Sequence, residues 1–191
     1  MESIKDLRKL CQEKGFQEHI TLRFHRIFSI YITKVFLILK IRPNVVTILG
    51  FLMGITGGYL FLNSYFLQGS VFFLVFLIFD YVDGEIARYR KLSSNFGAWL
   101  DTMSVHLLYP HFFFTLGLGI FFQTGIFWYT ILGAIAAMAK LIERSMVQPL
   151  IRNSNPKFLK NQTITSAKEW VNHIGKVSVQ YPVIFLCSLV G

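Results

Sequence analysis

Long apolar blocks separated by short polar links make up most of the chain. An α-helix needs about 20 mainly apolar residues to cross the hydrocarbon layer of a membrane. Four segments meet or nearly meet this length, namely 43–62, 69–87, 97–122 and 126–147. A fifth apolar run begins near Val179 and is still apolar at Gly191, as if cut inside a helix. The pattern predicts an all-α, polytopic transmembrane helix bundle that is truncated in its fifth spanning helix.

The segment from Ile27 to Ile41 is apolar and aromatic but is interrupted by Lys34 and flanked by basic residues. Such a segment is typical of an amphipathic helix that lies at the membrane interface. If it crossed the membrane instead, the amino terminus would lie opposite the other basic loops. We therefore divide the chain into residues 1–42, a cytoplasmic segment with an interfacial amphipathic helix, and residues 43–191, a transmembrane domain.

The placement of basic residues predicts the orientation in the membrane. With the 27–41 helix on the surface, one side receives the basic amino terminus, the turn with Arg88, Arg90 and Lys91, and the loop that carries Arg152, Lys157, Lys160 and Lys168. The links at 63–68 and 123–125 carry no charge and fall on the other side. Because basic loops stay inside, we expect the basic side to be cytoplasmic.

Composition agrees with a membrane protein. The 191 residues are 53% hydrophobic and 15% charged, which suits one membrane domain. The net charge is +9, but the Lys and Arg residues lie between apolar blocks and form no basic stripe interleaved with aromatic residues. We therefore expect no nucleic-acid partner. The polar stretch 1–19 lacks a following short apolar run and cleavage site, which argues against a cleaved signal peptide. Cys11 and Cys187 lie in very different settings, and we expect no disulfide.

Gly50, Gly54 and Gly58 are spaced by four and share one face of the first spanning helix. Small residues at this spacing let helices approach closely, so we interpret the face as a packing groove. Together with the Phe-rich surfaces, the same glycine face would also suit a homodimer.

The segment richest in chemistry joins the second and third spanning helices. It contains Asp80, Asp83, Gly84, Glu85, Ala87 and Arg88, and after a short turn Gly97 and Asp101. On a helix, the spacings of three, four, seven and eight place Asp80, Asp83, Gly84, Ala87 and Arg88 on one face. Ionisable groups near membrane depth usually face a polar cavity and contact one another or a cation. Three aspartates from neighbouring helices would make a hard oxygen site suited to Mg²⁺ or Mn²⁺.

The other residues of this segment suit a phosphate ligand. Gly84, Ala87 and Gly97 lack bulk where a nucleotide would approach the backbone, and Arg88 offers a planar donor fork to phosphate oxygen. The alternative is a set of interfacial charges, in which Asp80 and Asp83 pair with Arg88 and Arg90 while Asp101 caps a helix or snorkels. That alternative does not require small residues at those positions.

The spacing resembles the signature of the CDP-alcohol phosphatidyltransferase family, D-x-x-D-G-x-x-A-R followed by a spacer and G-x-x-x-D-x-x-x-D. Seven of the eight fixed positions match, and the start of the first spanning helix, Pro43-Asn44-x-x-Thr47, is also similar to the family. The resemblance implies a six-helix architecture with a catalytic-type domain in 43–191. It also makes Asn44 and Thr47 candidate substrate-binding residues, beside Gly84, Ala87, Arg88 and Gly97 of the signature.

The resemblance also implies a reaction. An acceptor hydroxyl would attack the phosphorus that carries the alcohol of a CDP-alcohol, and CMP would leave, as in phospholipid biosynthesis. Two Mg²⁺ or Mn²⁺ ions held by Asp80, Asp83 and Asp101 would bridge the diphosphate and neutralise developing charge. The site would face the cytoplasm, and membrane lipids would surround it.

One signature position differs. Val105 stands where the family usually has a fourth aspartate, assigned as catalytic base and metal ligand. His106 is the nearest replacement, although it lies about 140° around the helix from Asp101 and would need a bulge to face the site. Glu85 is a second candidate that we expect to meet headgroups or Lys91 instead. For His111, after Pro110, we expect a structural hydrogen bond.

Lys140, Glu143 and Arg144 cluster near the expected cytoplasmic end of the fourth spanning helix. Lys140 and Arg144 share a face that could touch a phosphate of the acceptor or a lipid headgroup. The alternative is snorkelling, with Glu143 as the partner.

Three functions remain open from the sequence. The first is an active metal-dependent phosphoalcohol transferase with another group in place of the fourth aspartate. The second is a degenerate relative that binds metal and CDP-alcohol or acts as a partner subunit. The third is a small transporter or channel with the aspartates as an ion site. The Gly, Ala and Arg positions favour the first two, because an ion pathway does not need them.

Overall fold

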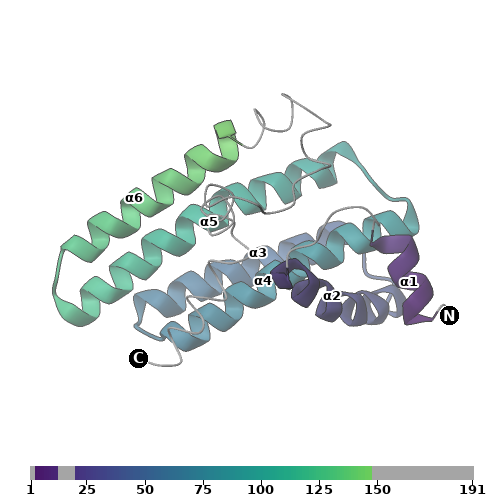
Figure 1. The fold of residues 1–191 in the computed structure, drawn as a ribbon, viewed down its shortest axis with the longest axis horizontal. Coiled ribbons are helices and arrows are strands. Elements are labelled where there is room, and N and C mark those ends of the chain that lie inside the picture. Colours follow the sequence, from purple (N-terminus) through teal and green to yellow (C-terminus); the bar gives the residue numbers. More distant parts are fainter. Residues whose placement is uncertain (1–2, 13–19, 148–191) are drawn as a thin grey trace. The chain divides into compact units, whose positions relative to one another are not determined.

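The computed structural model describes residues 3–12 and 20–147, and this part of the chain is all-helical (Figure 1). The elements are α1 (Ile4–Cys11), α2 (Ile20–Ile38), α3 (Pro43–Leu62), α4 (Phe66–Arg90), α5 (Asn95–Thr124), α6 (Trp128–Ile142) and a short π-helix, η1 (Glu143–Val147). No strand occurs among the described residues. The predicted all-α class is confirmed.

Three of these helices are long and apolar enough to cross a membrane: α3, α4 and α5. They coincide with the first three predicted spans, and α4 and α5 extend beyond them at both ends. The fourth predicted span is helical as well, but α6 has 15 residues before α-helical geometry gives way to η1 at Glu143. Because about 20 residues are needed to cross, α6 by itself is short, and its crossing stays a prediction.

The starts of two spanning helices follow from their sequences. Pro43 begins α3, where its missing N–H costs nothing and its fixed φ already suits a helix. Ser94 precedes α5, and its Oγ accepts a hydrogen bond from the backbone N–H of Gly97 at 3.0 Å. This hydroxyl satisfies one of the amide donors that the first turn of a helix leaves unpaired.

The carboxyl ends of α2, α3 and α4 share one capping geometry. Just after each helix a residue has positive φ, with 55° at Lys40, 64° at Ser64 and 54° at Lys91. The next backbone N–H then reaches back to a carbonyl of the last turn, as from Leu92 to Ala87 at 3.0 Å. This arrangement satisfies terminal carbonyls and turns the chain sharply.

The described residues form two compact units, and the first comprises those within 1–54 and 74–105. One apolar cluster in it joins α3 and α4 through Val46, Val82 and Ile86. A second cluster joins α1 and α2 through Leu7, Cys11 and Ile30, with Tyr89 of α4 packed against it. The predicted 27–41 helix overlaps α2 from Ile27 to Ile38, but α2 begins earlier, at Ile20, and ends earlier than predicted. Its position at the membrane interface stays a prediction.

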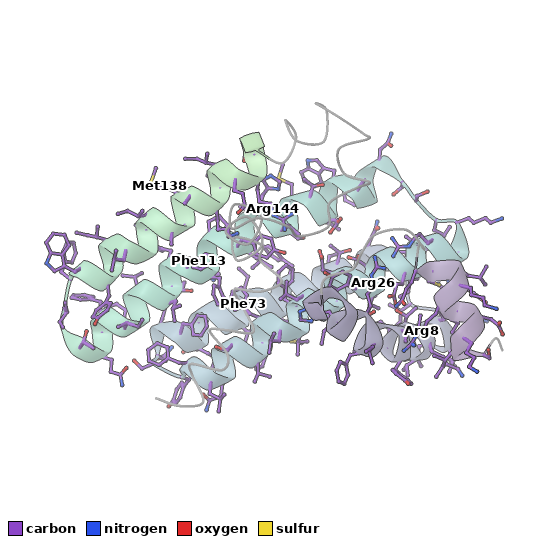
Figure 2. The ribbon with its side chains drawn as sticks, viewed as in Figure 1. Arg8, Arg26, Phe73, Phe113, Met138 and Arg144 are labelled. Atoms are coloured by element: carbon purple, nitrogen blue, oxygen red, sulfur yellow. The ribbon has the colours of Figure 1, made fainter. Side chains whose placement is uncertain are left out.

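The second unit comprises the described residues within 55–73 and 106–147. Its centre is aromatic: the rings of Phe61, Phe73 and Phe112 are buried, and Phe73 meets Phe112 edge to face with centroids 4.2 Å apart. Figure 2 labels Phe73 and Phe113 in this unit. Close helix approach accompanies the rings, since a Cβ at Gly117 of α5 would lie 2.9 Å from the Cα of Gly133 on α6.

The glycine face of α3 packs inside the chain. A Cβ at Gly50 would lie 3.1 Å from the Cβ of Phe79 on α4, and one at Gly58 would collide with the imidazole of His111 on α5. This confirms a packing groove at these two positions. Because intrachain contacts use them, they give no support to the expected homodimer.

Several sequence expectations lie outside the described residues. They are the loop with Arg152, Lys157, Lys160 and Lys168, the residue Cys187, and the apolar run from Val179 to Gly191. The domain division at residue 42, the truncation and the orientation of the basic loops therefore stay predictions.

Candidate functional site

Asp83 lies on the buried side of α4 and is bound to α3. Its side chain is 6% exposed, and its Oδ2 accepts a hydrogen bond from the Thr47 hydroxyl at 2.5 Å. Thr47 is itself buried near the start of α3. The structure therefore brings together an aspartate of the signature and a residue of the Pro43-Asn44-x-x-Thr47 segment.

The start of α5 supplies two more predicted residues to the same unit. Asp101 interacts electrostatically with the Asp83 carboxylate, so the two charges lie near each other. Gly97, one turn earlier, faces α3, because a Cβ built there would lie 2.9 Å from Oδ1 of Asn44. Any larger residue at 97 would displace Asn44. Helices α3, α4 and α5 thus meet at the signature residues.

Asp80, Asp83 and Asp101 carry the oxygen ligands that Mg²⁺ and Mn²⁺ prefer, so their chemistry suits a divalent cation. The geometry is less complete. Among the residues described, no group of three or more His, Cys, Asp or Glu side chains is arranged to hold a metal ion. Asp101 lies within electrostatic range of Asp83, but the three aspartates do not form a metal-binding group in the described residues. A shared ion would require these side chains to turn toward a common point.

Arg88 is held by the amino-terminal helix and not by an aspartate. Its Nε donates to the backbone carbonyl of Cys11 at 2.6 Å. In the described part of the chain no ion pair joins it to Asp83, although the two interact electrostatically. Arg90 donates to the carbonyls of Ile41 and Leu37 at 2.9 and 3.2 Å. The alternative of aspartate–arginine pairing is therefore not seen for Asp83.

Gly84 makes room for the Arg88 guanidinium. A Cβ at Gly84 would lie 3.2 Å from one terminal nitrogen of Arg88 and 3.6 Å from the other. The glycine lets the Arg88 side chain fold back over α4. The sequence predicted that Gly84 leaves room for a nucleotide, and it did not predict this contact with Arg88. Ala87 is partly buried on the same helix, and its carbonyl accepts the capping bond from Leu92.

Glu85 corrects an expectation. It was expected to meet headgroups or Lys91, but it is 1% exposed. Its Oε1 accepts hydrogen bonds from Gln12 Nε2 at 2.8 Å and Ser29 Oγ at 2.7 Å, and its Oε2 accepts one from Thr33 Oγ1 at 2.6 Å. A buried carboxylate is costly unless such donors satisfy it. Glu85 therefore joins α4 to the amino-terminal segment.

The three donors to Glu85 were missed from the sequence. Ser29 and Thr33 carry a signal that could have been used, because they are four residues apart and form a small uncharged polar face on the mainly apolar part of α2 after Arg26. Gln12 carries none, since it follows a short polar helix and is 73 positions from Glu85. A second missed contact is His25, which is 2% exposed and stacks on Tyr81 with ring centroids 6.0 Å apart. Burial lowers the pKa of His25.

Val105 and His106 follow Asp101 on α5. Val105 is 6% exposed, so an apolar side chain is buried where the signature has its fourth aspartate. The helix is continuous from Asn95 to Thr124, and no π-turn re-registers it at His106. The bulge that His106 would need as a base is therefore not seen. Its catalytic role stays a prediction.

The basic residues of the second unit contact protein groups. Lys140 is 5% exposed, and its Nζ binds Glu143 Oε2 at 2.6 Å. The Arg144 guanidinium, labelled in Figure 2, lies 4.5 Å from the ring centroid of Tyr109. The His111 imidazole lies near the backbone of Ile55, but in the described residues its buried Nε2 has no hydrogen-bond partner, so the expected structural hydrogen bond stays a prediction. The pairing of Lys140 with Glu143 matches the alternative given for this cluster, and its contact with substrate stays a prediction.

The chain is similar in sequence to known proteins. Residues 40–167, more than half of the chain, match the sequence model of a family described as CDP-alcohol phosphatidyltransferase. One relative is the "bifunctional IPC transferase and DIPP synthase" of Aquifex aeolicus strain VF5, 36% identical over 70 residues. That match covers 36% of this chain and 16% of the relative.

Proposed function

Because the chain belongs to the CDP-alcohol phosphatidyltransferase family, we propose that it moves a phosphoalcohol group from a CDP-alcohol to an acceptor alcohol, with release of CMP. The product would enter phospholipid biosynthesis. The observation that carries the proposal is the meeting of three helices around Asp83, where Thr47 binds its carboxylate and Asp101 lies within electrostatic range. A buried aspartate with a second, partly buried aspartate near it suits a charged ligand better than a lipid surface.

The proposed metal ligands are Asp80, Asp83 and Asp101. When bound, two Mg²⁺ or Mn²⁺ ions would supply charge neutralisation on the diphosphate. The chain's own residues prepare for this: Thr47 fixes one oxygen of Asp83 and leaves the other for a ligand. Asn44 packs on Gly97, which sets the spacing of α3 and α5 beside Asp101.

The proposed phosphate ligand is Arg88. Its Nε is engaged by Cys11, so its two terminal nitrogens remain to donate to phosphate oxygens as a fork. The small residues Gly84, Ala87 and Gly97 complete the proposed substrate surface. Lys140 and Arg144 would contact a phosphate of the acceptor only by leaving Glu143 and Tyr109.

In the proposed reaction the acceptor oxygen forms a bond to phosphorus while the bond from phosphorus to the CMP oxygen breaks. The acceptor proton must pass to a base, and such help is commonly worth roughly 10²–10⁴-fold. His106 is retained as the proposed base, because imidazole is the side chain most often used in general acid–base catalysis. To accept the proton, its ring would have to turn toward the site from its place on α5.

The proposed location of the site is the cytoplasmic face of the membrane. Basic residues border the described ends of the helices that carry the signature: Lys40 and Arg42 before α3, Arg90 and Lys91 at the end of α4. The excess of Lys and Arg on cytoplasmic loops supports this orientation.

The test is CMP release by the full chain in lipid nanodiscs with Mg²⁺. Donors would be CDP-diacylglycerol and CDP-aminoalcohols, offered with glycerol phosphate, inositol phosphate, serine or diacylglycerol. We expect release with at least one pair, and a loss of roughly 10³-fold in Asp101→Asn, because ligand removal forfeits several kcal/mol of charge stabilisation. Equal release by the wild type and Asp101→Asn would reject the proposal.

A second function is favoured by the buried Val105. Valine can neither accept a proton nor bind a metal, so the chain would be a degenerate family member that binds CDP-alcohol without efficient turnover, or a partner subunit. Val105→Asp separates the two. A degenerate site should gain CMP release, by roughly 10²-fold if a missing base is limiting. Unchanged release by a folded variant that still binds CDP would leave the active-enzyme proposal standing.

A further inference from the structure

Glu85 is a buried acidic side chain that the proposed chemistry does not use. Three donors satisfy it, Gln12, Ser29 and Thr33, with bond lengths of 2.8, 2.7 and 2.6 Å. Within the part of the chain that the structure describes, no cation forms an ion pair with it. A carboxylate held by hydrogen bonds from two other segments fixes their register, because each donor must meet a particular oxygen.

The donor Gln12 follows directly on Cys11, whose carbonyl binds Arg88. Cys11 is the last residue of α1 and is fully buried. Its carbonyl belongs to the last turn, where a helix leaves carbonyls without a partner and favours a positive charge. Gln12 is held further by its bond to the carbonyl of Arg26 at 3.0 Å. The end of α1 is therefore fixed to α4 at Glu85 and, three residues on, at Arg88.

The Arg88 side chain is directed by this contact. Its Nε is 2.6 Å from the Cys11 carbonyl, and its terminal nitrogens lie over Gly84, next to Asp83. Among the side chains that the structure describes, none forms a hydrogen bond with those nitrogens. Two described interactions therefore act on this exposed side chain, the hydrogen bond to the Cys11 carbonyl and the electrostatic interaction with Asp83, and the first fixes the position of Nε.

We propose that Glu85 is a positioning residue that docks the amino-terminal helix α1 on α4, so that the Cys11 carbonyl orients Arg88 toward a phosphate of the CDP-alcohol. The inference rests on the proposed function, because the phosphate it serves is that of the donor. It assigns to the amino-terminal segment a part in nucleotide binding that is separate from membrane attachment.

The test is a double-mutant cycle on CDP affinity, measured by calorimetry with the full chain in nanodiscs and Mg²⁺. Glu85→Met keeps the side-chain volume but removes both acceptor oxygens. We expect it to weaken CDP binding about tenfold, as is typical for residues that orient a ligand-binding group. Glu85→Gln should recover most of the loss, because its amide can still accept from Gln12 and Ser29 and donate to Thr33.

The decisive measurement repeats the change in an Arg88→Lys background. If Glu85 acts through Arg88, Glu85→Met should change CDP affinity less than about twofold there. A tenfold loss in both backgrounds would show a general structural role and overturn the inference.

Gln12→Met is a milder substitution that serves the same test if Glu85→Met does not fold. We expect it to weaken CDP binding about threefold in the wild-type background and not at all in the Arg88→Lys background. The control is Lys9→Met, at an exposed position of α1, which should leave the affinity unchanged.

Failure of the inference differs from failure of the proposed function. If the wild type does not bind CDP at all, the proposed function falls, and this inference falls with it. If the wild type binds CDP and the losses add across the cycle, the inference alone is rejected.

Discussion

The carboxyl-terminal part of α4 and the aromatic cluster around Phe112 are held together by different means. From Asp83 to Arg90, polar side chains of α4 hydrogen-bond to α1, α2 and α3 and to the residues that flank these helices. Around Phe112, stacked and edge-to-face rings and close-packed glycines hold the helices together. Hydrogen bonds fix particular atoms, whereas ring packing fixes volume. We therefore expect changes in the first region to alter function and changes in the second to alter stability.

The largest expected effect on stability is in the aromatic cluster. Phe112 is fully buried and contacts Phe61 and Phe73 edge to face. Phe112→Ala leaves a cavity and should cost roughly 3 kcal/mol of unfolding free energy. Thermal unfolding in detergent measures this, with CMP release per folded molecule as the second readout. Wild-type CMP release per folded molecule would confirm the contrast, and a clearly lower release per folded molecule would break it.

Thr47 gives the converse effect in the polar region. Thr47→Val keeps the shape but removes the hydroxyl that binds Asp83. Residues that orient a ligand-binding carboxylate typically contribute roughly 10- to 100-fold, so we expect a loss of CMP release of about that size. Thr47→Ser, which keeps the hydroxyl, is the matched control and should stay within a few-fold of the wild type. Equal losses in both variants would point to packing instead.

The smallest effect is expected at Arg144, which lies over the Tyr109 ring. Arg144→Gln should lower stability by about 0.5–1 kcal/mol, the usual size of a cation–π contact. Steady-state kinetics then decide its role. An unchanged Michaelis constant for the acceptor assigns Arg144 to packing, and a clear rise would instead give it the phosphate contact expected from the sequence.

Much of the fold could be predicted because its signals are local. The start of α3 at Pro43 and the three long spans follow from apolar length, and the signature residues on α4 follow from helical spacing. The partners of Glu85 could not be predicted, because they lie 73, 56 and 52 positions away and depend on how α1 and α2 pack. The same limit applies to Gly84, whose role depends on the rotamer of Arg88.

The sequence predicted that Asp80, Asp83 and Asp101 converge on a shared metal site, and the structure does not show this convergence in the described residues. Spacing fixes which face a residue occupies, so Asp80 and Asp83 share a side of α4. It does not fix side-chain rotamers or the distance between helices. Asp83 is turned to Thr47, and in the described residues the third carboxylate does not complete a metal-binding group.

Binding of Mn²⁺ in the presence of CDP tests the central claim most directly. Electron paramagnetic resonance of the full chain in nanodiscs would count bound ions in the wild type, in Asp83→Asn and in Asp101→Asn. We predict that CDP promotes binding of two ions in the wild type and that either substitution removes at least one. Mn²⁺ binding that is indifferent to CDP and to both substitutions would contradict the account.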